Sequence, residues 1–110
     1  MIKVSVLYPD HENSSFDIDY YVNTHATLAR ELLGSALKGF SIEHGLSGRE
    51  PGSRPIYIAM GHMYFDSIDE FQSAFGPVVE DMRADIPNYT DIQPILQISE
   101  VKLSKSPDLE

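Results

Sequence analysis

Histidines and tyrosines are the side chains of this sequence best suited to acid–base chemistry, and there are four of the first and six of the second. His25 is the most informative of them, because it lies where a helical pattern calls for a buried aliphatic residue. An imidazole titrates near neutral pH and can therefore act as a general base or acid. The simpler interpretation is a core histidine that bonds a strand carbonyl or a tyrosine.

Two further histidines and a tyrosine lie on predicted strands. His62 and Tyr64 share one face of a strand predicted over 56–65, because side chains alternate along a strand. We predict that both converge on His25 as catalytic residues, with Tyr21 one helical turn away to orient the imidazole. The predicted substrate-binding residues are Tyr21, His44, Phe40 and Met60. The alternative is that His44 and His62 lie at strand ends or at a subunit interface.

Other kinds of site have little support in the sequence. No two histidines have the i, i+4 spacing of a helical metal site. Glu43 and His44 are neighbours on a predicted strand and point to opposite faces, so they are poorly placed to bind one ion. A glycine-rich phosphate loop, a catalytic serine elbow and an acidic pair are also missing from the sequence. We therefore expect neither a metal nor a cofactor.

The composition is that of a small globular domain. The chain has 110 residues and a formal net charge of -9, which disfavours nucleic acid and anionic membrane surfaces as partners. The absence of cysteine excludes disulfides and suits a reducing compartment. No apolar run approaches the roughly 18 residues of a membrane span, and "MIKVSVLYP" starts in strand-like alternation with no signal-peptide region. We expect a cytoplasmic domain over residues 1–103, followed by a loose tail over 104–110.

Hydrophobic periodicity predicts the elements that position these residues. A strand over 2–8 precedes a helix that begins at the N-cap Asp17 and stops at Gly34. In a regular helix, Val22 and His25 both fall within its apolar stripe. The remaining predicted elements are strands over 37–46 and 56–65, a loop over 47–55, a helix that starts at Ser67 and is interrupted at Gly76 and Pro77, and a strand over 95–103.

The order of these elements is β-α-β-β-α-β, which predicts an α+β ferredoxin-like subunit. Two helices can cover only one face of a four-stranded sheet. The strand over 56–65 is apolar on both faces, so the second face also needs a cover. We expect this cover to be a second copy of the chain, giving a homodimeric α+β barrel.

Three blocks of the sequence resemble the EthD family, which belongs to the dimeric α+β barrel superfamily. They are "FDIDYYVNTHATLARELLGSALKGFSIEHGLSG", "YIAMGHMYFDSIDEFQSAFGP" and "ADIPNYTDIQPILQISEV", and the resemblance runs from about Met1 to Val101. The family is named for a member tied to ethyl tert-butyl ether degradation, which implies a role in catabolism. Its histidine corresponds to His25 in "NTHATL", although members usually have a proline where this chain has Thr27.

The resemblance and the residues together predict the kind of reaction. We expect cofactor-free acid–base chemistry of an isomerase, cyclase or lyase type on a small aromatic, lactone or polyketide-like compound. Related dimeric barrels include isomerases, polyketide cyclases and quinol-forming monooxygenases, so a cofactor-free monooxygenase-like activity is one alternative. The other is a non-catalytic protein that binds a hydrophobic metabolite or serves a partner enzyme as an accessory subunit. All of these need the same apolar pocket.

Overall fold

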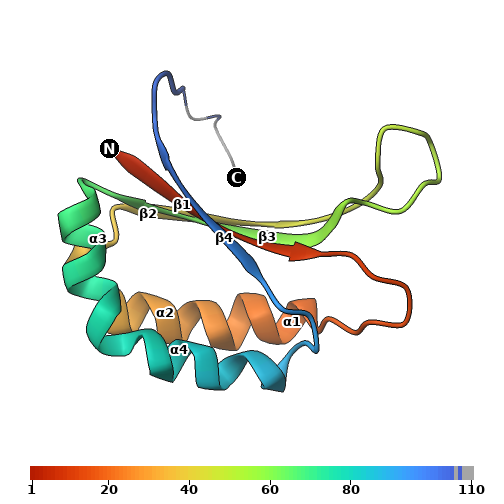
Figure 1. Cartoon of the computed structure of the whole chain (residues 1–110), viewed down its shortest axis with the longest axis horizontal. Helices are drawn as coiled ribbons and strands as arrows, with labels where there is room; N and C mark the ends of the chain where they lie inside the picture. Colours follow the sequence, from red (N-terminus) through yellow and green to blue (C-terminus); the bar gives the residue numbers. More distant parts are fainter. Residues whose placement is uncertain (106, 108–110) are drawn as a thin grey trace.

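The computed structural model describes residues 1–105 and 107, so most of the predicted tail over 104–110 lies outside the described residues. Four strands form one antiparallel sheet in the order β2-β3-β1-β4. Their bounds are Ile2–Pro9 for β1, Gly39–His44 for β2, Tyr57–Phe65 for β3 and Ile95–Glu100 for β4. With the helices between them, the strands give the predicted β-α-β-β-α-β order (Figure 1).

The first helical segment has three parts, α1 (Ile18–Tyr20), a π-helical turn (Tyr21–His25) and α2 (Ala26–Leu33). Asp17 caps it as predicted, because its side chain accepts a hydrogen bond from the backbone N–H of Tyr20. Gly34 ends α2 with a φ of 59°, a conformation that glycine adopts without strain. The π-helical turn is not predicted by a regular apolar stripe.

The second helical segment consists of α3 (Ile68–Phe75) and α4 (Val79–Asp85). The predicted interruption is confirmed, because a 3-10 turn over Gly76–Val78 separates the two helices and contains Pro77. Ser67 caps α3 by accepting a hydrogen bond from the N–H of Glu70. Among the described residues, no helix is both long enough and apolar enough to cross a bilayer.

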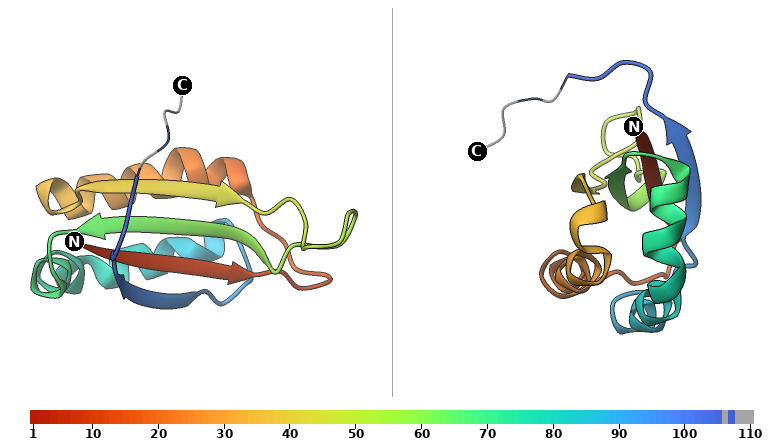
Figure 2. Two further views of the ribbon diagram at one scale, coloured as in Figure 1. Left: turned by 90° about the horizontal axis from the view of Figure 1, so that it is seen from above. Right: turned by 90° about the vertical axis from the view of Figure 1, so that its left-hand side faces the viewer.

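Both helical segments pack on the same face of the sheet (Figure 2). Alternation along β1 turns Ile2, Val4 and Tyr8 toward the helices, where all three are buried. Their neighbours on β3 that face the same way include Ala59 and Phe65, which are also buried. The hydrophobic core therefore lies between this face and the helices, and the other face of the sheet is uncovered within the described part of the chain.

The uncovered face combines apolar side chains with a central polar cluster. Leu7 and Met60 supply apolar surface. The cluster is a chain of four hydrogen-bonded side chains: Ser5 bonds His62 at 2.8 Å, His62 bonds Glu43 at 2.9 Å, and Ser41 bonds Glu43 at 2.8 Å. Both ring nitrogens of His62 therefore have partners on this face.

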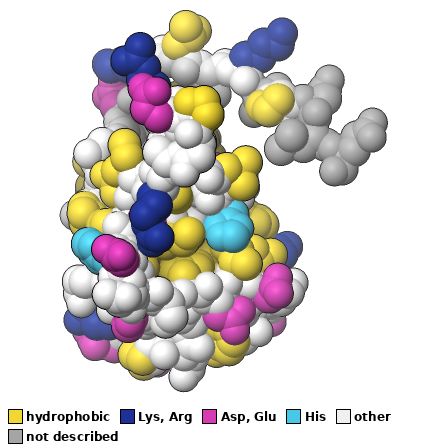
Figure 3. Space-filling model, turned by 90° about the vertical axis from the view of Figure 1, so that its right-hand side faces the viewer, with side chains coloured by type: hydrophobic (Ala, Val, Ile, Leu, Met, Phe, Trp, Pro, Cys, Tyr) yellow, Lys and Arg dark blue, Asp and Glu magenta, His cyan; other side chains and the backbone are white. Residues whose placement is uncertain are grey.

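The long loop between β2 and β3 is attached to the end of β1. Arg54 bonds the carboxylate of Asp10 through two nitrogens, at 2.8 and 2.9 Å. Leu46 and Ile56, which flank the loop, are 90% and 74% exposed. Hydrophobic side chains accordingly lie among charged ones at this end of the molecule (Figure 3).

Candidate functional site

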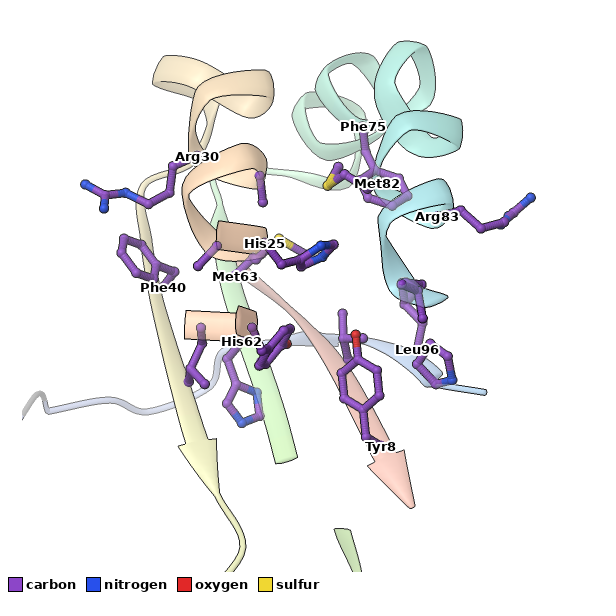
Figure 4. A pocket seen from close by; sticks show the side chains of 18 of the residues that line it. Tyr8, His25, Arg30, Phe40, His62, Met63, Phe75, Met82, Arg83 and Leu96 are labelled. Carbon is purple, nitrogen blue, oxygen red and sulfur yellow. The ribbon is translucent and has the colours of Figure 1, made fainter. Parts of the chain in front are cut away.

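A cavity of about 270 Å³ lies between the helices and the sheet. It crosses the whole sheet, since residues of all four strands line it. Met63, Phe75 and Met82 make its walls apolar, while His25, Tyr8 and Tyr21 contribute polar atoms (Figure 4). A mostly apolar cavity with a few polar groups is typical of small-molecule sites.

His25 is held by a carboxylate on the other helical segment. Its Nδ1 lies 2.9 Å from Oδ2 of Asp85, and both side chains are 12% exposed. The second carboxylate oxygen of Asp85 accepts hydrogen bonds from Tyr20 Oη at 2.6 Å and Asn88 Nδ2 at 2.9 Å. Burial acts to raise the pKa of Asp85, but the hydrogen bonds from Tyr20, Asn88 and His25 outweigh it, and the pKa is lowered from its ordinary value. Asp85 is therefore an ionised acceptor at neutral pH.

The ionised Asp85 determines the tautomer of neutral His25. A carboxylate can only accept, so Nδ1 carries the proton and donates it to Asp85, which leaves the lone pair on Nε2. Nε2 has no protein partner among the described residues. Every fully buried side-chain nitrogen and oxygen in that part of the chain does have one, so Nε2 must be open to solvent. His25 therefore lines the cavity with one nitrogen held by an aspartate and the other open.

Three tyrosines form a cluster beside the imidazole, and two of them contact it. The rings of Tyr21 and Tyr89 lie with their centroids 5.6 and 4.8 Å from that of His25. Tyr8 Oη and Tyr89 Oη are 2.7 Å apart and share a hydrogen bond. Burial, the largest influence in each case, raises the pKa of Tyr8, Tyr21 and Tyr89 far above the usual range. All three hydroxyls therefore stay protonated and can donate hydrogen bonds.

The π-helical turn gives this arrangement its local geometry. The N–H of Ala26 bonds the carbonyl of Tyr21, five residues back, so this turn holds more residues than an α-helical one. The wider turn brings Tyr20 onto Asp85 while Tyr21 stays buried against the sheet. Val22, which a regular helix would bury, is 46% exposed for the same reason. Turns of this kind are frequent at functional sites.

Glycine at position 61 makes room for Tyr21. A Cβ atom on Gly61 would lie 2.3 Å from Tyr21 Oη, well inside contact distance. The tyrosine hydroxyl can therefore approach the backbone of β3 only because this residue has no side chain.

The predicted convergence of His62 and Tyr64 on His25 is wrong. His62 pairs with Ser5 across β1 and β3, and both side chains point to the uncovered face. His62 is among the residues that border the cavity, but its ring bonds Ser5 and Glu43 on the face of the sheet away from the helices (Figure 4). Tyr64 and Met60 have the same parity on β3 and so face the same way as His62. Because side chains alternate along β3, all three lie on the opposite face of the sheet from His25.

Of the remaining residues predicted to bind the substrate, two line the cavity and one does not. Tyr21 and Phe40, predicted to bind the substrate, line the cavity. His44 lies on the helix-facing side of β2, but it is at the end of the strand, exposed, and outside the cavity lining. Residues 1–105 and 107 hold no group of three or more His, Cys, Asp or Glu side chains that could bind a metal ion.

Asp85 is the important residue that sequence reasoning missed. It follows Met82 by three residues, so it continues the apolar stripe of the second helical segment as an acidic residue. His25 interrupts the stripe of the first segment in the same way. Each of the two helices packed on the sheet thus has one polar residue within its apolar stripe. This shared feature could have predicted that His25 and Asp85 contact each other.

Solved structures place the chain in a known structural class. It superposes on a dimeric ferredoxin-like protein of unknown function from Thermobifida fusca with a TM-score of 0.55 and 16% identity, covering 91% of this chain and 90% of that one. An ethyl tert-butyl ether degradation family protein from Bacillus halodurans gives a TM-score of 0.63 at 24% identity, with 92% and 98% covered. The protein therefore has a ferredoxin-like α+β fold.

Sequence similarity then defines the family. The EthD domain matches residues 9–93. An EthD-like protein from Ralstonia eutropha is 41% identical, covers 96% of this chain and 95% of its own, and superposes with a TM-score of 0.91. No curated protein gives a significant match. The chain belongs to the EthD family.

Proposed function

We propose that the protein catalyses proton transfer on a small aromatic, lactone or polyketide-like carbonyl compound, with His25 as the general base. The observation that carries this proposal is the pairing of His25 Nδ1 with Asp85, which leaves Nε2 as an open lone pair in an apolar cavity. A carboxylate behind an imidazole fixes its tautomer and stabilises the imidazolium that forms when a proton is taken. A protein that only bound an apolar compound would have no need of this hydrogen-bonded pair.

The surrounding groups fit abstraction of a proton next to a carbonyl. His25 Nε2 takes the proton, and the bonding electrons move to the carbonyl oxygen to form an enolate. Tyr8 or Tyr21 donates a hydrogen bond to that oxygen, which favours the transition state over the ground state. The imidazolium then returns the proton to the same carbon or to another, and the second outcome is an isomerisation. No external oxidant or cofactor enters these steps.

The volume limits the size of the substrate. An engineered cavity of about 150 Å³ accommodates benzene. A cavity of about 270 Å³ therefore suits one substituted ring or two fused rings. The apolar walls formed by Met63, Phe75 and Met82 would also strengthen the interaction between Asp85 and the imidazolium, since they lower the local dielectric.

We also propose that two chains associate through the uncovered faces of their sheets. Leu7 and Met60 supply apolar surface for this contact. The similar protein from Thermobifida fusca is described as dimeric, which supports the same arrangement here. His62 and Glu43 would then lie inside the barrel, away from the cavity, where they form a polar contact between subunits.

Hydrogen exchange tests the catalytic proposal without knowledge of the full reaction. Small aryl ketones and lactones are incubated with the protein in deuterated water, and loss of the proton signal next to the carbonyl is followed by NMR. We expect enzyme-dependent exchange that falls by about 10²–10⁴-fold in His25→Gln. Tyr64→Phe is the matched control, since Tyr64 lies on the opposite face, and it should exchange normally. Ligand binding with no exchange in the wild type would indicate a binding protein instead.

A further inference from the structure

Each end of the cavity carries an arginine. Arg30 of α2 and Phe40 of β2 lie at one end, beside one edge strand of the sheet. Arg83 of α4 and Leu96 of β4 lie at the other end, beside the opposite edge strand (Figure 4). Cations are scarce in this chain, which has 8 lysines and arginines against 17 acidic residues. Two of them at one cavity therefore call for an explanation.

The two arginines differ in their partners. Arg83 Nη1 bonds Glu80 Oε1 at 2.9 Å, so its charge is balanced locally, and Arg83 and Arg30 are both exposed. Arg30 has no carboxylate partner in the described part of the chain. Its guanidinium carbon lies 5.0 Å from the ring centroid of Phe40. Stacking on an aromatic ring orients a guanidinium and leaves the N–H groups at its edge available.

The charges around the cavity favour one orientation of a bound anionic ligand. Asp85 is ionised and lies behind His25, so an anionic group next to the imidazole would be repelled. An anionic group at Arg30 would instead meet an unbalanced cation with donors that match a carboxylate. The formal net charge of -9 disfavours anions in general, which makes such a local cation necessary for their capture.

We infer that the substrate carries a carboxylate, which Arg30 binds at the β2 end of the cavity while the reacting carbon lies at His25. This inference rests on the proposed function, because it assumes that the cavity accepts a small ring compound. It adds the chemical class of the substrate, a planar carboxylic acid, and makes Arg30 the residue that selects it.

Two probes of equal shape test the inference. Titrations with 2-naphthoate and with its neutral analogue 2-naphthamide are followed by NMR at low salt. We expect the wild type to bind the carboxylate about tenfold more tightly than the amide. Arg30→Gln should remove this preference and leave the affinity for the amide unchanged, whereas Arg30→Lys should keep part of it. Arg83→Gln is the matched control at the other end, and it should keep the full preference.

The possible failures can be told apart. Equal binding of both probes by the wild type would overturn the carboxylate assignment and leave the proposed proton-transfer site intact. Loss of the preference in Arg83→Gln but not in Arg30→Gln would also overturn it, because the anion would then lie at the β4 end. If the folded wild type binds neither probe at millimolar concentration, the cavity does not accept ring compounds, and both this inference and the proposed function fail.

Discussion

His25 and Asp85 are 60 residues apart in the sequence, yet Nδ1 of one lies 2.9 Å from Oδ2 of the other. The contact joins the π-helical turn of the first helical segment to the last residue of α4. It therefore ties the two helical segments together above the sheet at the edge of the cavity. The same contact leaves one nitrogen of the imidazole free for a ligand.

The pairing makes stability depend on pH in a defined direction. In the folded protein the pKa of Asp85 is lowered below its ordinary value of 3.8. The carboxylate therefore contributes stability above its unfolded pKa. That contribution disappears as the pH falls through the folded pKa. We expect Asp85→Asn to reduce the free energy of unfolding by about 1–2 kcal/mol at neutral pH and by less below pH 3.8. Urea unfolding at both pH values measures this, and a pH-independent difference would contradict the assigned ionisation.

Enlarging residue 61 should displace Tyr21. In Gly61→Ala the new methyl group would lie 2.3 Å from Tyr21 Oη, so either the hydroxyl or the strand must move. We expect a loss of about 1–3 kcal/mol in the free energy of unfolding and weaker ligand binding. Thermal unfolding and an NMR titration with 2-naphthamide measure the two effects.

Gly76→Ala is the control for this substitution. A Cβ atom there meets nothing within 4 Å, and Gly76 already has a helical φ of -50°. The variant should be neutral or more stable by up to about 1 kcal/mol. If both variants behave alike, the close approach of Tyr21 to β3 is not the reason for glycine at position 61.

Removing the first N-cap should weaken the helical segment that carries His25. Asp17 Oδ1 accepts from the N–H of Tyr20 at 3.1 Å, and Asp17→Ala leaves that donor without its partner. We expect a loss of about 0.5–2 kcal/mol. Chemical denaturation provides the measurement, with Asp19→Ala as a control that keeps the cap. An unchanged stability for Asp17→Ala would mean that the cap does not hold the segment in solution.

The uncovered face of the sheet predicts the oligomeric state. We expect the protein to sediment at about twice 12.3 kDa at micromolar concentration. Met60→Glu places a charge on this face and should shift the protein toward monomer, whereas Gln72→Glu at an exposed position of α3 should not. A soluble wild-type monomer at that concentration would contradict sheet-to-sheet association.

The sequence was sufficient for the fold because its patterns are local. Alternation in β1, the cap at Asp17 and the interruption at Pro77 each depend on neighbouring residues, and each is confirmed. The site depends on contacts between distant elements, which local patterns do not specify. His62 lies on the strand predicted for it, but its side chain points away from His25. Which residues of β3 face the helices depends on the register of the strand in the sheet.

The π-helical turn limited prediction in a second way. A regular helix of 3.6 residues per turn places Tyr20 near solvent and Val22 in the core. The wider turn instead half-buries Tyr20 against Asp85 and exposes Val22. No residue type marks such a turn in the sequence. The hydrogen-bonded support of Asp85 by Tyr20 and Asn88 could therefore be found only in the structure.

The tautomer of His25 is the most direct test of the account, and it requires no substrate. Long-range nitrogen–proton NMR correlations of the imidazole, recorded at about pH 8, distinguish a protonated Nδ1 from a protonated Nε2. We predict that neutral His25 carries its proton on Nδ1, facing Asp85, and that Asp85→Asn weakens this preference. We also predict that the Nε2 signal shifts when 2-naphthoate is added. A proton on Nε2 in the wild type would contradict the account, because that nitrogen could then donate a hydrogen bond but could not act as the base.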